Sequence, residues 1–444
     1  MTGRRVNPTV GAARIFSLLL VVALLSFGLG AATPGIAAAN RTLPAHDTFY
    51  KYSGHTPLGK LKPGTVLKTR AITLAVGPLA TPVSATQLLF RTTDQLGRPI
   101  ADVTTVIAPV PVPVLPRVVG YLSFYDGLGA KCDPSYTLAG GDAGGATDSQ
   151  AEEEELLMAF YVANGWIVTV PDYEGEHQHW MAGRESGQAT LDALRATEFA
   201  LGLGTTTQVA LSGYSGGAVA ADWASELAPR YAPELTLSAV AEGGIPVDYA
   251  HLFSYVSGDN VYSAAMPGML LGLARAYHLP LGRYLSSYGK KIVSAESNTC
   301  ITEDFGHYPG LTVRRLFKSG HHDPFKIPAV ARILNGQLMG RAPGHPLVPL
   351  MMGVGNVDGF GDGVMRDGDV ESLAREYCRQ GVAVEFHRYG GAGHESAGAY
   401  FEPETATFFQ GRFNGLPFAG NCGSIPRGDS LAPLPIGAEI GVRR

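Results

Sequence analysis

Residues 208–227 read QVALSGYSGGAVAADWASEL and contain a G-x-S-x-G pentapeptide centred on Ser215. An apolar run, Val209–Leu211, leads into the pentapeptide, and the small residues from Ala218 onward favour a helix. Glycines beside the serine permit a sharp turn between strand and helix, which would expose the Ser215 hydroxyl at the helix N-terminus. With 57 glycines in 444 residues the pentapeptide alone is weak evidence. The prediction that Ser215 is a nucleophile therefore rests on the position of the pentapeptide between a strand and a helix.

The segments around this turn alternate between buried strands and helices. Further strands are predicted at 118–124, 166–170, 349–354 and 382–386, and helices at 152–164, 191–201, 216–227, 370–380 and 403–413. This rhythm is typical of βαβ units in a parallel sheet, so we expect an α/β fold. Residues 40–100 instead alternate apolar and polar side chains between Pro-Gly turns, which predicts antiparallel strands at the start of the sheet.

Between residues 245 and 344 the alternation stops. The spacing of Met269, Leu270 and Leu273 indicates an amphipathic helix, and no buried strand is evident in this stretch. We interpret it as an inserted, mainly helical cap. The predicted organisation is a core of residues 40–244 and 345–422, a cap of residues 245–344 and a C-terminal tail of residues 423–444.

The first 39 residues have the composition of a secretory signal peptide. Three arginines precede an apolar run, Ile15–Gly30, and the small residues Ala37–Ala39 follow as a cleavage site. An uncleaved membrane anchor is the alternative, although the run is short for a spanning helix. Cleavage near Ala39 would place the mature protein in the cell envelope or outside the cell.

The overall composition excludes several classes of protein. With 45% hydrophobic and 16% charged residues the chain can bury a large core, which excludes a natively unfolded protein. The net charge is −5, and residues 1–39 carry three positive charges and no negative one, so the mature chain is more acidic still. We therefore expect no nucleic-acid partner.

A nucleophilic serine needs a histidine as base, and the histidine needs a carboxylate to orient it. In a fold of this kind both partners follow the serine in sequence, acid first, each just after a strand. His394 follows the strand at 382–386 and is the best-placed base. The acid is Asp358 or Asp362, and the short distance of Asp358 from the end of the preceding strand favours Asp358.

Attack on an acyl group also needs two donors for the developing oxyanion. The backbone N–H of Gly216, next to the nucleophile, is one candidate. The other lies in the loop after the strand at 118–124, Tyr125-Asp126-Gly127. There Asp126 could donate its backbone N–H while its carboxylate braces the turn.

The four cysteines, at positions 132, 300, 378 and 422, are far apart in sequence and follow the predicted signal peptide. This pattern is typical of disulfides that close long loops in an exported protein, and it leaves three pairings open. No C-x2-C spacing of a zinc site is present. We expect no metal and no cofactor.

Several separate motifs resemble the secretory lipases of the lipase A type, within the α/β-hydrolase superfamily. They are FYD at 124–126, CDPSY at 132–136, PDYEG at 171–175, AGR at 182–184, LDALRA at 191–196, GYSGG at 213–217 and the stretch from Tyr377 to His394. Together they span nearly the whole predicted mature chain and are more specific than the pentapeptide alone.

The resemblance implies an α/β-hydrolase fold with a mostly parallel central sheet and an inserted helical lid. It implies Ser215 as nucleophile, His394 as base, and Asp126 and Gly216 as oxyanion donors. It also implies disulfides between positions 132 and 300 and between 378 and 422. The sequence departs from the family at the acid, where Asp358 and Asp362 lie in a longer loop without the usual proline.

The residues and the resemblance together predict a secreted serine hydrolase of carboxylic esters, a triacylglycerol lipase or a lipase-like carboxylesterase. Its partner would be an ester or lipid substrate, met at a transient lipid–water interface. An acyltransferase of the cell envelope is an alternative with the same chemistry. A secreted binding protein that keeps the fold without turnover is an alternative of another class.

Overall fold

The structure is a computed structural model that describes residues 42–76, 79–141, 148–258 and 260–436. The predicted signal peptide, residues 1–39, lies outside the described residues, as does the end of the predicted tail. Among the described helices, none combines the length and the apolar character that crossing a bilayer requires.

A single sheet organises the described part of the chain. It has 9 strands in the order β1-β2-β3-β5-β4-β6-β7-β8-β9. The strands are β1 (Val66–Val76), β2 (Leu79–Thr93), β3 (Pro99–Ile107), β4 (Arg117–Leu122), β5 (Ile167–Pro171), β6 (Gln208–Tyr214), β7 (Thr236–Gly243), β8 (Leu350–Asn356) and β9 (Val384–Gly390). Strands β1 to β3 run antiparallel, and β5, β4 and β6 to β9 are parallel neighbours. The predicted α/β fold with a mostly parallel sheet and an antiparallel start is confirmed.

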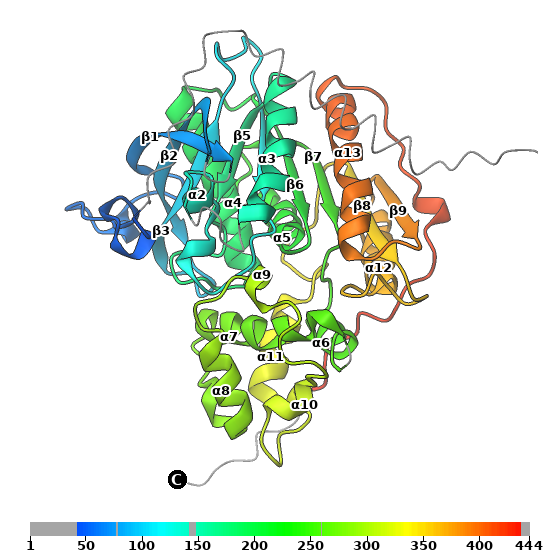
Figure 1. Ribbon diagram of the computed structural model, residues 1–444. Helices are drawn as coiled ribbons and strands as arrows, with labels where there is room; N and C mark the ends of the chain where they lie inside the picture. The colour runs from blue at the N-terminus through cyan, green and yellow to red at the C-terminus, as the bar shows by residue number, and fades with distance from the viewer. Residues whose placement is uncertain (1–41, 77–78, 142–147, 259, 437–444) are drawn as a thin grey trace, which may run out of the picture.

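Helices cover both faces of the sheet (Figure 1). Those of the core are α2 (Pro134–Thr137), α3 (Asp148–Ala163), α4 (Gly183–Leu201), α5 (Gly216–Tyr231), α12 (Asp367–Arg379) and α13 (His394–Phe413). Adjacent strand residues divide between two apolar clusters, because side chains alternate across a strand. Val118 belongs to the cluster with α4, α5 and α12, whereas Val119 belongs to the cluster with α3 and α13.

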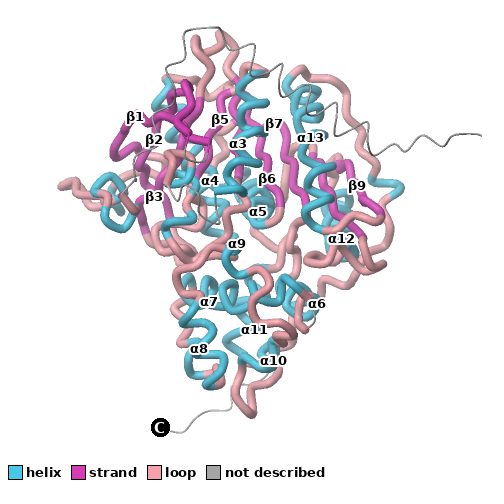
Figure 2. Tube along the Cα trace, viewed as in Figure 1, coloured by secondary structure: helices cyan, strands magenta, loops and turns pink. Residues whose placement is uncertain are grey.

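Between β7 and β8 the described chain forms helices and loops but no named strand, as Figure 2 shows. The helices are α6 (Tyr249–Tyr255), α7 (Met266–Ala276), α8 (Ser287–Ala295), α9 (Ile301–Asp304), α10 (Val313–Leu316) and α11 (Pro328–Gln337), with a short 3-10 helix, η5 (Val261–Ala265). They gather at one end of the sheet (Figure 1). Parallel strands β6, β7 and β8 have their carboxyl ends at the same edge, so this group of helices lies over the edge that carries Ser215.

Three elements differ most from the sequence-based expectation. Helix α4 begins at Gly183, eight residues before the predicted start at 191. Strand β7 was not predicted, because its apolar Ala-Val-Ala core is only three residues long. Helix α13 begins at His394 rather than at Pro403, which lies inside it.

Candidate functional site

Ser215 occupies the turn between β6 and α5. Its backbone has φ 54° and ψ −120°, outside the regions that residues with a side chain normally adopt. Its N–H donates to the carbonyl of Gly243 at 2.8 Å, which fixes the turn to the end of β7. A Cβ on Gly213 would lie 2.2 Å from the carbonyl oxygen of Gly217, so this tight turn requires glycine. The expected strand, turn and helix around Ser215 are present.

His394 lies beside Ser215, at the start of α13. Its Nε2 is 2.8 Å from Ser215 Oγ, and its Nδ1 is 2.8 Å from Asp362 Oδ2. The hydroxyl of Tyr214 donates to the His394 carbonyl at 2.6 Å and so ties the start of α13 to the strand that carries the serine. Ser215, His394 and Asp362 therefore form one continuous hydrogen-bonded chain. They follow three different strands, β6, β9 and β8 respectively.

The protonation of His394 depends on two opposing effects. Burial disfavours the charged imidazolium, but the negative charge of Asp362 and its hydrogen bond outweigh burial and raise the pKa of His394 above its ordinary value. An imidazole held in this way is a stronger base toward a neighbouring hydroxyl.

The carboxylate beside His394 belongs to Asp362, which corrects the preference for Asp358. Asp362 is buried, and its other oxygen accepts the backbone N–H groups of Val364 and Met365 at 2.9 and 2.6 Å. Asp358 instead accepts from the hydroxyl of Tyr255 at 2.8 Å and braces its own turn. Strand β8 continues to Asn356, two residues beyond the predicted end. Asp358 therefore lies in the exposed turn that follows the strand, and Asp362, further along the same loop, contacts the histidine.

Asp126 and Gly216, the predicted oxyanion donors, lie together beside Ser215. Both line the cavity that Ser215 enters. The Asp126 backbone has a positive φ of 21°. Within the part of the chain that the structure describes, its N–H donates to no protein acceptor. Burial raises the pKa of the Asp126 carboxyl to about 7, against the lowering influence of Trp180 and His394.

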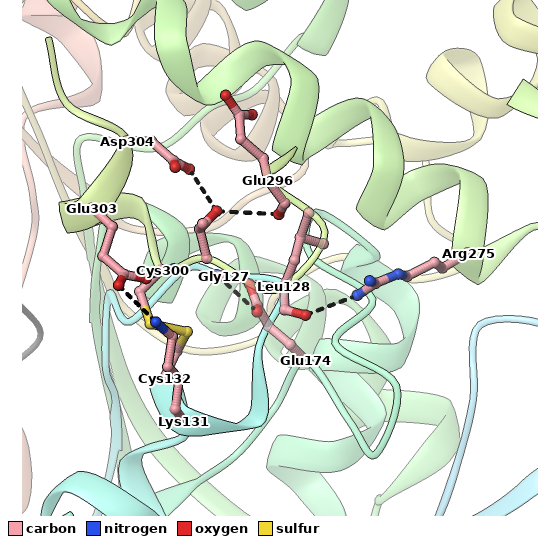
Figure 3. Close-up of a disulfide and its surroundings, with 11 residues drawn as sticks. Gly127, Leu128, Lys131, Cys132, Glu174, Arg275, Glu296, Cys300, Glu303 and Asp304 are labelled. Atoms are coloured by element: carbon pink, nitrogen blue, oxygen red, sulfur yellow. Dashed lines mark hydrogen bonds and ion pairs between the residues drawn. A yellow bond between two sulfur atoms is a disulfide. The ribbon is translucent and has the colours of Figure 1, made fainter. Parts of the chain in front are cut away.

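The loop that carries Asp126 is anchored to the segment around Cys300 (Figure 3). Ile301 N–H donates to the Asp126 carbonyl at 2.9 Å, and Leu128 N–H donates to the Thr299 carbonyl at 2.9 Å. A disulfide between Cys132 and Cys300 joins the same two segments covalently. The backbone is thus held at the Asp126 carbonyl and two residues later, at Leu128.

Glu174 supports the same loop and was not singled out from the sequence as a functional residue. Its carboxylate accepts the N–H of Gly127 at 3.2 Å (Figure 3). Its own N–H donates to the hydroxyl of Tyr125 at 2.7 Å. Burial holds the pKa of Glu174 well above its ordinary value. Its place in the PDYEG motif after β5 was the available signal.

The cavity at Ser215 is apolar and small. It measures about 40 Å³. Beyond Ser215, Gly216 and Asp126, its lining comprises Trp180, Met181, Pro246, Leu252, Val256, Tyr262, Ala265, Met269, Ile301, Val364 and Met365. By volume it holds a few water molecules and no acyl chain.

Tyr262 lines this cavity and contacts the histidine. Its ring meets that of His394 edge-on with centroids 6.3 Å apart, and its hydroxyl donates to the carboxylate of Glu395. Sequence analysis did not single out Tyr262, because the contact joins η5 to α13 across 133 positions of the chain.

The cysteine pairing implied by the family resemblance is confirmed. Cys132 bonds to Cys300 and Cys378 bonds to Cys422. The first bridge joins the Asp126 loop to the helices between β7 and β8, and the second joins α12 to the C-terminal segment. Among the described residues, no cluster of three His, Cys, Asp or Glu side chains could hold a metal ion.

Comparison with known proteins finds relatives among lipases. The secretory lipase family model matches residues 144–421. A Mycobacterium tuberculosis protein named "Probable inactive lipase" is 30% identical, over 84% of this chain and 83% of its own. A secreted triacylglycerol lipase of Malassezia furfur is 29% identical, over 85% of this chain and 77% of its own.

Among solved structures, Candida antarctica lipase A in its closed state superposes with a TM-score of 0.79 at 26% identity, covering 88% of this chain and 91% of that one. The shared architecture is the α/β-hydrolase fold, as predicted. The family model covers more than half of the chain, and the Mycobacterium tuberculosis protein is 30% identical over more than two thirds of both chains. The chain therefore belongs to the secretory lipase family.

Proposed function

We propose that this protein is a secreted serine hydrolase of carboxylic esters, with Ser215 as nucleophile, His394 as general base and Asp362 as the orienting acid. One observation carries the proposal: the hydrogen-bonded chain from Ser215 Oγ through His394 to Asp362, with both contacts at 2.8 Å. A serine hydrolase needs this geometry, because the histidine must reach the serine hydroxyl while the carboxylate fixes the tautomer of the histidine.

The reaction has two halves. Ser215 Oγ attacks the ester carbonyl as His394 Nε2 takes its proton, and the N–H groups of Asp126 and Gly216 stabilise the oxyanion. His394 then gives that proton to the leaving alcohol, and an acyl-enzyme remains. Water, deprotonated by His394, attacks the acyl carbon, and the carboxylic acid leaves as Ser215 recovers its proton.

We further propose that the enzyme is a triacylglycerol lipase and that the acyl group of its substrate enters the apolar cavity. Residues 245–344 would act as a cap between core segments 40–244 and 345–422, since cap residues such as Leu252 and Met269 line that cavity. At about 40 Å³ the cavity excludes an acyl chain, so substrate entry requires the cap to move. The Tyr262–Glu395 hydrogen bond is one contact that must break.

The site also bears on the alternative of a binding protein without turnover. The Mycobacterium tuberculosis relative carries the word "inactive" in its name. In the present chain the serine, the histidine and the acid are all present and mutually hydrogen-bonded, which supports turnover.

The test is hydrolysis of p-nitrophenyl esters from acetate to palmitate and of an emulsified triglyceride. Ser215→Ala should abolish turnover and labelling by an active-serine phosphonate. Ser294→Ala, which removes an exposed hydroxyl, should change neither. Sustained rates on long chains support the lipase, and turnover confined to short chains supports a carboxylesterase. Equal residual rates in wild type and Ser215→Ala would overturn the proposal.

Secretion is part of the proposal, because disulfides persist outside the cytoplasm. N-terminal sequencing of protein recovered from the culture medium or the envelope should find a mature chain that begins close to Asn40. A retained Met1 would favour the uncleaved anchor.

A further inference from the structure

A second, larger cavity lies between α12 and the C-terminal segment. It is an open groove of about 560 Å³ and shares no lining residue with the cavity at Ser215. In Figure 1 the red C-terminal segment descends past α12. Two hydrogen bonds hold the two together, from Ser372 Oγ to the Asp429 carbonyl at 2.5 Å and from Arg375 to the Ile425 carbonyl at 2.9 Å.

Four arginines line this cavity, which we call the arginine groove: Arg341, Arg375, Arg379 and Arg427. They come from three separate segments. Arg375 and Arg379 are four residues apart on α12 and share one face of the helix. Arg341 follows α11, and Arg427 belongs to the C-terminal segment. The fold, rather than a run of sequence, brings these side chains to one place.

The acidic side chains of the groove leave the arginines in excess. Two carboxylates line it, Glu376 and Asp429. Asp429 forms its ion pair with Arg366, at 2.7 Å, and Arg366 is not a lining residue. Glu376 pairs with Arg379. The groove is therefore positively charged in a chain whose net charge is −5.

The guanidinium groups retain unused donors. Arg375 and Arg341 each donate to a carbonyl of the C-terminal segment, which holds their positions but occupies only part of their five N–H groups. Arg427 has no hydrogen-bond or ion-pair partner among residues 42–76, 79–141, 148–258 and 260–436. Clustered cations repel one another, and a bound anion would offset that repulsion.

We propose that the arginine groove binds a phosphate ester whose organic part has the size of glycerol or a sugar. Planar guanidinium groups bind phosphate oxygens in pairs, and several of them converge here. The volume is within the range of small-molecule sites and exceeds what a bare anion needs. The phosphate can belong to a soluble ester or to a phospholipid headgroup, and the site is independent of ester hydrolysis at Ser215.

The experiment measures binding of glycerol 3-phosphate and inorganic phosphate by calorimetry, and of phosphatidylcholine vesicles with and without phosphatidylglycerol by sedimentation. The variant is Arg379→Gln with Arg427→Gln, since neither side chain donates to the backbone of the C-terminal segment. The matched control is Arg283→Gln with Arg314→Gln, which removes the same charge at two exposed positions elsewhere. Thermal unfolding of both proteins verifies that they fold.

Saturable binding of glycerol 3-phosphate, weakened at least about tenfold in the groove variant and less than about twofold in the control, supports the proposal. Vesicle binding that needs phosphatidylglycerol and is lost in the groove variant assigns the phosphate to a lipid headgroup. Binding of the soluble ester without vesicle binding assigns it to a soluble metabolite. The proposal is overturned if glycerol 3-phosphate does not bind at up to about 10 mM and the vesicles do not bind either, or if both variants bind like wild type.

Discussion

Replacing Asp362 by Asn separates the two candidate acids by experiment. Asp362 accepts the Nδ1–H of His394 and, through its other oxygen, two backbone N–H groups of its own loop. Asparagine retains one oxygen for the loop, so the loop should keep its shape. Its amide NH₂ would then face the Nδ1–H, and two donors cannot bond to each other.

The histidine can avoid this clash by moving its proton to Nε2. It would then have no lone pair facing Ser215 Oγ and could not take the serine proton. Loss of the correct tautomer in a Ser-His-Asp site costs about 10⁴-fold in kcat, or about 5 kcal/mol of transition-state stabilisation. We expect a loss of that order for Asp362→Asn.

The pH profile gives a second readout of the same variant. The charge of Asp362 raises the pKa of His394, so hydrolysis by wild type should increase with pH through a value above 6.5 as the imidazole loses its proton. Removing that charge should shift the acid limb of the residual activity to lower pH. A general loss of folded protein would scale the profile without shifting it.

Asp358→Asn is the matched control. Asp358 lies four residues earlier and contacts Tyr255 and its own turn instead of the histidine. We expect kcat/KM on p-nitrophenyl butyrate to change by less than about threefold, since one acceptor oxygen remains. A loss in Asp358→Asn equal to that in Asp362→Asn, or more than about a tenth of wild-type activity in Asp362→Asn, would refute the assignment.

Three further perturbations test other parts of the structure. Replacing Cys132 and Cys300 by Ala should lower the free energy of unfolding by about 2–4 kcal/mol and reduce kcat more than KM changes, because the bridge holds the Asp126 loop; an unchanged denaturation midpoint would contradict this. Burial raises the pKa of Glu154 from 4.5 to about 7, so its contribution to stability is complete below pH 4.5 and is lost as pH rises through 7. Glu154→Gln should therefore remove about 3 kcal/mol from the change in unfolding free energy between pH 4 and 8, measured by urea titration at both values. Tyr262→Phe removes the hydrogen bond to Glu395 and should raise kcat/KM on soluble esters severalfold; a fall would show that the bond supports the active arrangement instead.

Much of the fold was predictable because its signals are local. The run before Ser215, the glycines around it and the small residues after it predict strand, turn and helix without reference to the rest of the chain. β7 was missed since its apolar core is only a few residues long. The start of α13 was misplaced: the helix begins at His394 and Pro403 lies inside it, at its tenth residue.

The candidate site was predictable to the level of residue types and order. Ser215 and His394 follow from their placement after strands, and the structure brings them together at 2.8 Å. The choice between Asp358 and Asp362 was not predictable from spacing. Both follow β8 within six residues of Asn356, and a turn closed by backbone pairing of Gly361 with Arg366 decides which carboxylate points inward.

The sequence by itself determined the strand–turn–helix around Ser215, the order of the reacting side chains and the alternation that specifies a mostly parallel sheet, because each depends on neighbours within a few residues. Only the tertiary structure decided which aspartate contacts His394, that Tyr262 lines the cavity and bonds to Glu395, and that four arginines from three segments line one groove. Those contacts join positions far apart in the chain, such as 32 residues between Asp362 and His394 and 133 between Tyr262 and Glu395. Local propensity carries no information about such distances, since they are set by how the whole sheet and its helices pack.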